Sequence, residues 1–339
     1  MPLKVVMTMF RYPGIPADEE AYRKLGAGFT HQPCATEDEI VAAAGEADAV
    51  ITAMQPYSRG VIHRLPKLRL ISVVGIGFEG VDVAAATEHG VLVANVPDYC
   101  QDEVSSHVMA LILACNRKLI RIVDAVKEGK WDSLEKPRIR HDIMPPLPRL
   151  RGQTLGLVGF GRIARSLTPK AQAMGLRVLA HDPFVPRDTA RDLGVDLMEL
   201  GKLLVESDYV SVHAAQSADN VKLLGQKQFE QMKPTAFLIN TARGGLVDEE
   251  ALCAALTGGR IAGAALDVTD PEPPIPDGPL LGMENIILTA HTAQFSDEAM
   301  ADLRRGVEEN VFSLLRGEWP RGLVNPDARE RYSQKWGSP

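Results

Sequence analysis

The chain has 339 residues, of which 45% are hydrophobic and 24% are charged, and its formal net charge at pH 7 is −7. This balance is typical of a folded globular protein, and the length exceeds what one hydrophobic core usually supports, so we expect two domains. The negative net charge argues against nucleic acid or an anionic membrane as the main partner.

The cysteines and the N-terminus predict a cytoplasmic protein. No two of the four cysteines form a CxxC pair or a cluster, which predicts reduced thiols and no metal site; they are Cys34, Cys100, Cys115 and Cys253. No apolar run approaches the length of a membrane span, and the start MPLKVVMTMF does not lead into a signal-peptide cleavage region.

Short apolar, β-branched runs alternate with helical stretches along the chain. The first series of runs lies at 4–9, 48–53, 69–74 and 91–95, and the second lies at 154–160, 176–180, 208–213, 236–240, 261–268 and 286–290. Strands that alternate with helices form parallel sheets from βα units. The sequence therefore predicts an α/β protein with two doubly wound parallel sheets.

Two helical patterns and one loop complete this outline. Apolar spacing predicts one long helix over 102–128 that ends at Gly129. This helix would serve either as a subunit interface or as a buried scaffold. Residues 135–152 are rich in proline and positive charge and predict an extended loop. A last amphipathic helix is expected over 296–316, ending at Gly317.

The segment GLVGFGRIAR follows a predicted strand and opens a predicted helix. Gly159, Gly161 and Ala164 have the spacing G-x-G-x-x-G/A, which lets backbone approach a pyrophosphate at a helix N-terminus. Asp182 lies 21 residues beyond Gly161, at the end of the next strand, where a carboxylate hydrogen-bonds adenosine ribose hydroxyls. Its charge repels the 2′-phosphate of NADP, so we expect NAD as the cofactor, although Arg187 nearby leaves the strictness of this preference open.

Polar residues follow three later strands in succession. Arg243 comes after the strand at 236–240, Asp267 and Glu272 come after the next strand, and His291 comes after the last one. Ligands of open α/β sheets bind at this carboxyl edge, a guanidinium suits a carboxylate, and histidine is the natural acid/base near neutral pH. These residues predict an active site at the sheet edge.

Together, these motifs resemble the D-isomer-specific 2-hydroxyacid dehydrogenase family over nearly the whole chain. The segments NTARGGLVDE, VVGIGFEGVDVAAATEHGVLVANVP, DVTDPEP and HTA carry the resemblance along with the glycine motif. The segment VPDYCQDEV is most similar to the phosphoglycerate dehydrogenase-like branch of the family, which includes C-terminal-binding proteins.

The resemblance implies a role for each site residue. Arg243 would bind the substrate carboxylate, His291 held by Glu272 would exchange the proton, and backbone N–H groups of Ile76 and Gly77 would complete substrate binding. Asp267 would hold the nicotinamide carboxamide. Further cofactor contacts would come from Val104, Phe160, Arg162, Ile163, His213, Ala214, Asn220, Thr241, Ala242 and His291 itself.

The resemblance also implies an architecture. A flavodoxin-like substrate-binding domain, residues 1–101 completed by 293–339, would hold an inserted Rossmann NAD-binding domain at 102–292. Dimerisation through the helix at 102–128 is typical of such enzymes, so we expect a homodimer.

Two other functions remain open at this stage. The same fold serves NAD-sensing, corepressor-like proteins, although a paired acid/base favours turnover. Phosphite dehydrogenases share the same residue types, whereas Glu272 argues against the formate type. A separate hypothesis is that one arginine of the basic loop at 136–151 reaches an active site and selects a second anionic group; that loop contains Arg138, Arg140, His141, Arg149 and Arg151.

Overall fold

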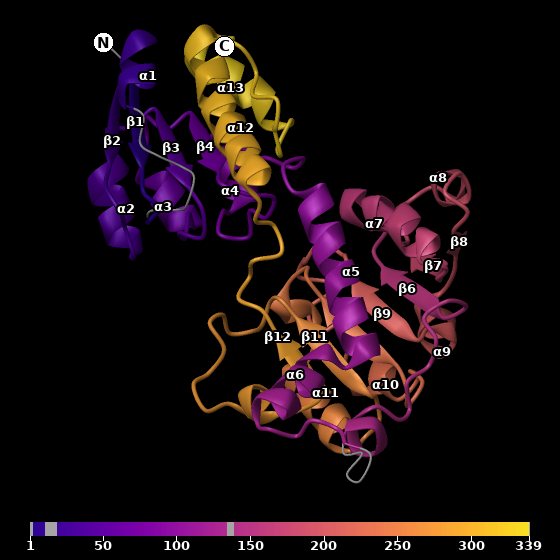
Figure 1. Ribbon diagram of the computed structural model, residues 1–339. Coiled ribbons are helices and arrows are strands. Elements are labelled where there is room, and N and C mark those ends of the chain that lie inside the picture. Colours follow the sequence, from indigo (N-terminus) through magenta and orange to yellow (C-terminus); the bar gives the residue numbers. More distant parts are fainter. Residues whose placement is uncertain (1–2, 11–18, 134–138, 339) are drawn as a thin grey trace. The chain divides into compact units, whose positions relative to one another are not determined.

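The computed structural model describes residues 3–10, 19–133 and 139–338. The chain divides into two compact units, one of residues 1–99 with 295–339 and one of residues 100–294 (Figure 1). The predicted boundaries, 1–101 with 293–339 and 102–292, differ from these by two residues. The return of the chain to the first unit makes that unit discontinuous in sequence.

The first unit is built on a five-stranded parallel sheet in the order β2-β1-β3-β4-β5. Its strands are β1 (Leu3–Met7), β2 (Ala27–His31), β3 (Ala49–Thr52), β4 (Leu70–Val73) and β5 (Leu92–Ala94). Its helices are α1 (Glu19–Lys24), α2 (Glu37–Ala44), α3 (Arg59–His63), α4 (Val83–Glu88), α12 (Asp297–Arg316) and α13 (Ala328–Trp336). This strand order is that of flavodoxin-like folds, as predicted.

The second unit is built on a seven-stranded parallel sheet in the order β12-β11-β10-β9-β6-β7-β8. The strands are β6 (Thr154–Val158), β7 (Arg177–His181), β8 (Asp196–Leu197), β9 (Tyr209–Val212), β10 (Phe237–Asn240), β11 (Gly263–Leu266) and β12 (Ile286–Leu288). The helices are α5 (Gln101–Arg117), α6 (Leu119–Lys127), α7 (Arg162–Ala173), α8 (Arg187–Arg191), α9 (Leu200–Glu206), α10 (Gln226–Phe229) and α11 (Glu249–Thr257). The strand order reverses between β6 and β9, which is where doubly wound sheets bind ligands.

The central strands are buried because both sheet faces are covered. Every residue of β6, β9 and β11 is buried, and α5 packs beside α7 on one face (Figure 1). Continuous apolar runs, rather than alternating ones, are what such strands require. All ten predicted strands are confirmed.

The predicted helix over 102–128 is wrong as a single helix. It breaks at Lys118, whose φ of 51° is left-handed, so α5 ends and α6 begins at that residue. The Lys118 ammonium donates to the carbonyl oxygens of Ile143 and Pro145, and Asn116 donates to Pro148 O and to the Tyr209 hydroxyl. These contacts hold the break, and an apolar period cannot reveal them.

Three further features differ from the sequence prediction or complete it. The short strands β2 and β8 were missed, because both are half-exposed edge strands with little apolar content. The loop predicted over 135–152 contains a π-helical turn at Ile139–Ile143. The helix predicted over 296–316 is confirmed as α12, with Ser296 capping its start and left-handed Gly317 ending it, but it is not the last helix, since α13 follows and was missed.

Within the described ranges, no helix has the length and apolarity that crossing a bilayer requires. The cytoplasmic location stays a prediction.

Candidate active site

The turn from β6 to α7 is shaped by its first glycine. Gly159 has a φ of +95°, and a Cβ there would lie 2.5 Å from the backbone nitrogen of Ala214 and 2.7 Å from the carbonyl carbon of His213. Only glycine lets the turn pass this close to the end of β9. Gly161 is different, since a Cβ there would meet no described atom within 4 Å. The turn therefore packs closely against His213 and Ala214 at Gly159, whereas Gly161 leaves space beside the backbone.

Asp182 follows β7 and stabilises the glycine turn between β6 and α7 through hydrogen bonds to the backbone. Its carboxylate accepts the backbone N–H of Phe160 at 2.8 Å and that of Phe184 at 2.9 Å. The half-buried carboxylate thus lies directly beside the turn, where the sequence placed it. Arg187 is exposed in the first turn of α8.

Residues that follow β9 pack against the glycine turn at Gly159. His213 Nε2 lies 2.8 Å from the Ser211 hydroxyl, and burial lowers the pKa of His213 to about 4, so its ring is neutral at neutral pH. Asn220 braces the following loop, because its side chain accepts Ser217 N–H and donates to Ala215 O. The structure therefore gives Asn220 a bracing role, and its predicted contact with the cofactor stays a prediction.

Arg243 is held in an extended turn after β10. Buried Asn240 accepts the N–H of Ala242 at 3.0 Å and donates to Arg243 O at 2.9 Å, and Arg243 Nη1 donates to Ala242 O at 2.6 Å. A Cβ at the next residue, Gly244, would lie 2.0 Å from Thr269 O. The turn that carries Arg243 therefore touches the loop that follows β11.

His291 and Glu272 form the predicted pair. His291 Nδ1 lies 2.6 Å from Glu272 Oε1, and each side chain is about one-third exposed. A carboxylate at Nδ1 accepts a hydrogen there and leaves Nε2 as the atom that exchanges protons. His291 itself has a left-handed φ of 52°, so the turn around it needs support.

Asp267 supplies that support, a role that no sequence motif indicated. Its carboxylate is 2% exposed and accepts the Thr289 hydroxyl at 2.5 Å, Thr292 N–H at 2.9 Å and Ala293 N–H at 3.0 Å. The backbone N–H of His291 also donates to Asp267 O at 2.8 Å. One buried carboxylate thus fixes the turn that presents the imidazole.

Glu249 braces the loop before Glu272 in a similar way. Its Oε1 accepts the Asp270 N–H at 2.7 Å, and burial raises the pKa of Glu249. Only its position in NTARGGLVDE hinted at a role.

The remaining predicted residues lie in several places. Val104 is buried in the first turn of α5, Phe160 is buried beneath the glycine turn, Arg162 is exposed at the start of α7, and Ile163 follows it. Ile76 and Gly77 belong to the first unit, in the segment after β4. Ile76 O accepts from Asn95 Nδ2, and the N–H groups of both residues make no hydrogen bond to a described residue.

The end of the basic loop lies away from the catalytic residues of its own chain. It leads into the amino end of β6, and Arg151 packs against Gly175, just before the amino end of β7. The catalytic residues follow the carboxyl ends of β10, β11 and β12, at the opposite edge of this sheet. Arg151 therefore lies away from these residues, Arg138 lies outside the described residues, and the hypothesis that one residue of this loop reaches an active site stays a prediction.

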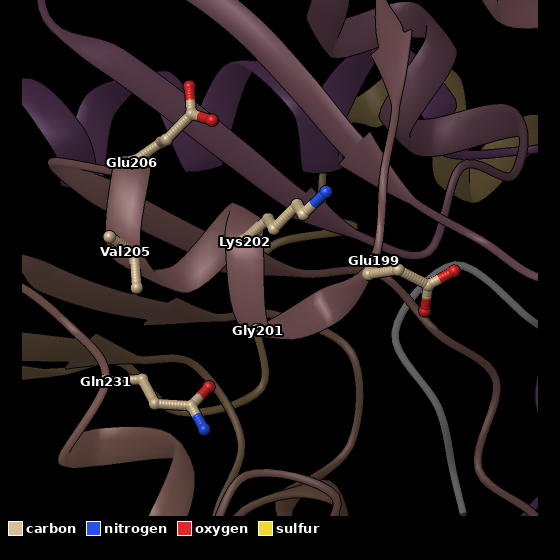
Figure 2. Close-up of a pocket in the computed structure, with 6 residues that line it drawn as sticks. All are labelled: Glu199, Gly201, Lys202, Val205, Glu206 and Gln231. Carbon is tan, nitrogen blue, oxygen red and sulfur yellow. The ribbon is translucent and has the colours of Figure 1, made fainter.

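A separate pocket of about 480 Å³ lies along α9 (Figure 2). Its lining residues are Glu199, Gly201, Lys202, Val205, Glu206 and Gln231. It contains no predicted site residue. Among the described residues, no group of three or more His, Cys, Asp or Glu side chains could hold a metal ion.

Two observations fit a dinucleotide at the β6–α7 turn. The Thr241 hydroxyl, after β10, is buried and has no hydrogen-bond partner among the described residues, so a ligand group there would satisfy it. No side chain caps the start of α7, which leaves its first N–H groups to an anion above Gly161. Together with the strand order and the acid/base pair, these features define a nucleotide-dependent oxidoreductase.

Comparisons with known proteins identify the family. Residues 109–293 match the family model "D-isomer specific 2-hydroxyacid dehydrogenase, NAD binding domain". The chain is 36% identical to the glyoxylate reductase of Korarchaeum cryptofilum over 85% of this chain and 86% of that protein. It is 34% identical to the D-3-phosphoglycerate dehydrogenase of Archaeoglobus fulgidus over 91% of this chain, but only 58% of that longer protein.

A solved structure agrees with these relatives. The TT0316 protein of Thermus thermophilus superposes with a TM-score of 0.83 at 30% identity, covering 95% of this chain and all of that one. This chain belongs to the D-isomer specific 2-hydroxyacid dehydrogenase family and is an NAD-dependent oxidoreductase. The similarity to the branch of C-terminal-binding proteins stays a prediction.

Proposed function

We propose that the protein interconverts a small 2-oxo acid and the corresponding D-2-hydroxy acid. The observation that carries the proposal is the His291–Glu272 pair at 2.6 Å, on a turn braced by Asp267, with the Arg243 turn touching the Glu272 loop. Arg243 binds the substrate carboxylate through its guanidinium and polarises the neighbouring carbonyl. The contribution of the Ile76 and Gly77 N–H groups to carboxylate binding stays a prediction from the family resemblance.

In the reduction, His291 delivers the proton. When bound, NADH supplies the hydride that the carbonyl carbon receives. His291 Nε2 donates its proton to the carbonyl oxygen, while Glu272 stabilises the protonated imidazole at Nδ1 and keeps the ring oriented. In the oxidation, the neutral ring accepts the hydroxyl proton at Nε2.

The cofactor side of the site divides into three parts. The turn at Gly159 and Gly161 with the start of α7 takes the diphosphate, and Asp182 binds the adenosine ribose and disfavours the phosphate of NADP. Thr241, Ala242 and Val104 line the nicotinamide end. Asp267 accepts a hydrogen bond from the nicotinamide carboxamide, so that one face of the ring meets the substrate.

The substrate is expected to be small and to carry one carboxylate. Relatives of this chain are named glyoxylate reductase and D-3-phosphoglycerate dehydrogenase, and the acids in these two names set the lower and upper limits of the substrate size that we expect. We expect glyoxylate and hydroxypyruvate rather than phosphorylated acids, because Arg243 is the only arginine or lysine among the residues proposed to bind the substrate.

The test follows NADH oxidation with glyoxylate, hydroxypyruvate, pyruvate and 3-phosphohydroxypyruvate, and identifies the enantiomer formed on a chiral column. We expect turnover of glyoxylate and hydroxypyruvate, and D-glycerate from the latter. Arg243→Lys should raise KM for the 2-oxo acid about 100-fold, because an ammonium cannot bind a carboxylate through two parallel hydrogen bonds. The control Arg191→Lys changes an exposed residue of α8 and should leave KM unchanged.

Other results would replace the proposal. NADH binding without turnover of any 2-oxo acid would favour a sensing protein, and NAD reduction by phosphite would favour that reaction. L-glycerate as the product would contradict the stereochemistry.

We also propose that the protein is a homodimer in which α6 contributes to the interface. Three apolar residues of this short helix are 46%, 48% and 45% exposed, namely Leu119, Ile120 and Val123. Such a cluster marks a protein interface more often than a solvated surface. Ile120→Glu should shift the species seen by sedimentation velocity from dimer to monomer, whereas Val205→Glu on α9 should not. A wild-type protein that sediments as a monomer at micromolar concentration would contradict the proposal.

A further inference from the structure

One helical residue outside the predicted site touches its most buried carboxylate. His107, on the second turn of α5, has its Nε2 atom 3.2 Å from the Thr289 hydroxyl oxygen and 3.9 Å from Asp267 Oδ1. The Thr289 hydroxyl lies 2.5 Å from the same Oδ1 atom. α5 precedes the glycine motif by some fifty residues, so no local motif predicts this contact.

The hydrogen bonds that link His107, Thr289 and Asp267 allow only one arrangement of their hydrogen atoms. The Thr289 hydroxyl has a single hydrogen, and it donates that hydrogen to Asp267. The Thr289 oxygen must then accept the contact with His107, which makes Nε2–H the donor. The hydrogen bonds therefore run in one direction, from His107 to Thr289 to Asp267.

This series of hydrogen bonds decides which Asp267 oxygen can accept a further hydrogen bond from a ligand. Oδ1 accepts two hydrogen bonds, from Thr289 and from Thr292 N–H, whereas Oδ2 accepts one, from Ala293 N–H. A carboxylate oxygen accepts about two hydrogen bonds, so Oδ1 is saturated and Oδ2 has room for one more.

Resting on the function proposed above, we propose that His107 is a positioning residue for the nicotinamide carboxamide. By holding Thr289 on Oδ1, it presents Oδ2 to the carboxamide NH₂ group. It touches neither substrate nor cofactor, and it acts only through Thr289 and Asp267. Because the proposal concerns the nicotinamide end alone, the adenosine and diphosphate contacts should not depend on His107.

The experiment compares two ligands that differ at that end. NADH contains the nicotinamide, whereas ADP-ribose lacks it, and both dissociation constants are measured by calorimetry on the intact protein. His107→Phe keeps a flat ring but removes the donor, and it should weaken NADH binding about tenfold while leaving ADP-ribose binding unchanged. His107→Gln keeps an N–H donor at a similar distance and should restore NADH binding to within about threefold of wild type.

Thr289 provides the internal control. Thr289→Val should reproduce the loss for NADH, Thr289→Ser should not, and His107→Phe combined with Thr289→Val should bind NADH no more weakly than Thr289→Val alone. Additive losses in the double variant would overturn the proposal. So would equal weakening of both ligands, or unchanged NADH binding in a folded His107→Phe protein.

Turnover separates this inference from the proposed function. If wild type reduces no 2-oxo acid but His107→Phe weakens the binding of NADH and not that of ADP-ribose, the proposed function fails and the positioning role stands. If wild type turns over and the two ligands respond alike to His107→Phe, only the positioning role fails.

Discussion

The two sides of the site in the second unit are held by different means. On the cofactor side, the turn after β6 is held by backbone close packing at Gly159 and by one carboxylate, Asp182, that lies at the end of the adjacent strand. On the catalytic side, the turns of Arg243 and His291 are held by buried side chains, chiefly Asn240 and Asp267. A dinucleotide site can thus rest on local backbone geometry, whereas an acid/base site needs side-chain braces from several loops.

The largest expected effect tests the catalytic side. His291→Asn should lower kcat about 1000-fold, because the acid/base group is lost, while asparagine tolerates the left-handed backbone at that position. NADH affinity should change less than threefold in a fluorescence titration. His141→Asn, in the exposed basic loop, is the control and should be fully active. Residual activity above a tenth of wild type would show that another group exchanges the proton.

The next effect tests whether each glycine serves the protein or the ligand. Gly161→Ala should weaken NADH binding about 30-fold and leave the melting temperature within about 2 °C, since its Cβ meets no described atom but would crowd a diphosphate. Gly159→Ala should lower both NADH binding and the melting temperature, because its Cβ would collide with the end of β9. Calorimetric melting and fluorescence titration measure the two quantities. The same loss of stability in both variants would remove this distinction.

A smaller effect sharpens the role of Asp182. Asp182→Asn should raise the ratio of kcat/KM for NADPH to that for NADH about tenfold, because the repulsion of the 2′-phosphate disappears while one oxygen remains to accept the Phe160 N–H. Steady-state kinetics with both cofactors measure the ratio. Asp188→Asn, on the exposed helix α8, should leave the ratio unchanged. An unchanged ratio in Asp182→Asn would mean that shape, and not charge, excludes the phosphate.

The smallest effect concerns His213, which lies between the two sides. Its folded-state pKa is about 4, below the ordinary value of 6.5, so between these pH values the unfolded chain binds a proton that the folded chain does not. The free energy of unfolding should therefore fall as pH drops from about 6.5 to about 4, by about 3 kcal/mol. His213→Gln should flatten this part of the urea-unfolding pH profile. An equally steep fall in the variant would assign the pH dependence to other groups.

Local patterns predicted much of the site. The strand–glycine–helix spacing around Gly159, the acidic residue at 182 and the polar residues after three successive strands depend on contacts between near neighbours in sequence or on the common edge of a parallel sheet. The pairing of His291 with Glu272 followed from the same reasoning and the family resemblance, and the structure brings these two side chains together.

Three of the missed features depend on residues far apart in sequence. The helix break at Lys118 is held by carbonyl groups from 143 and 145, Glu249 braces a loop twenty-one residues later, and His107 meets Thr289 across 182 positions. None of these contacts leaves a period or a spacing in the sequence, since a single polar side chain inside a helix has many roles that look alike.

The sequence alone determined the fold class and the glycine turn after β6, and it predicted the types of the reacting groups, because backbone sterics and strand alternation act over a few residues. Only the tertiary structure decided how those groups are held, because hydrogen bonds to Asp267 and Asn240 form when separate strands end at one sheet edge. Directional hydrogen bonds in a buried site depend on three-dimensional placement to within a fraction of an ångström, and spacing along a chain does not specify that.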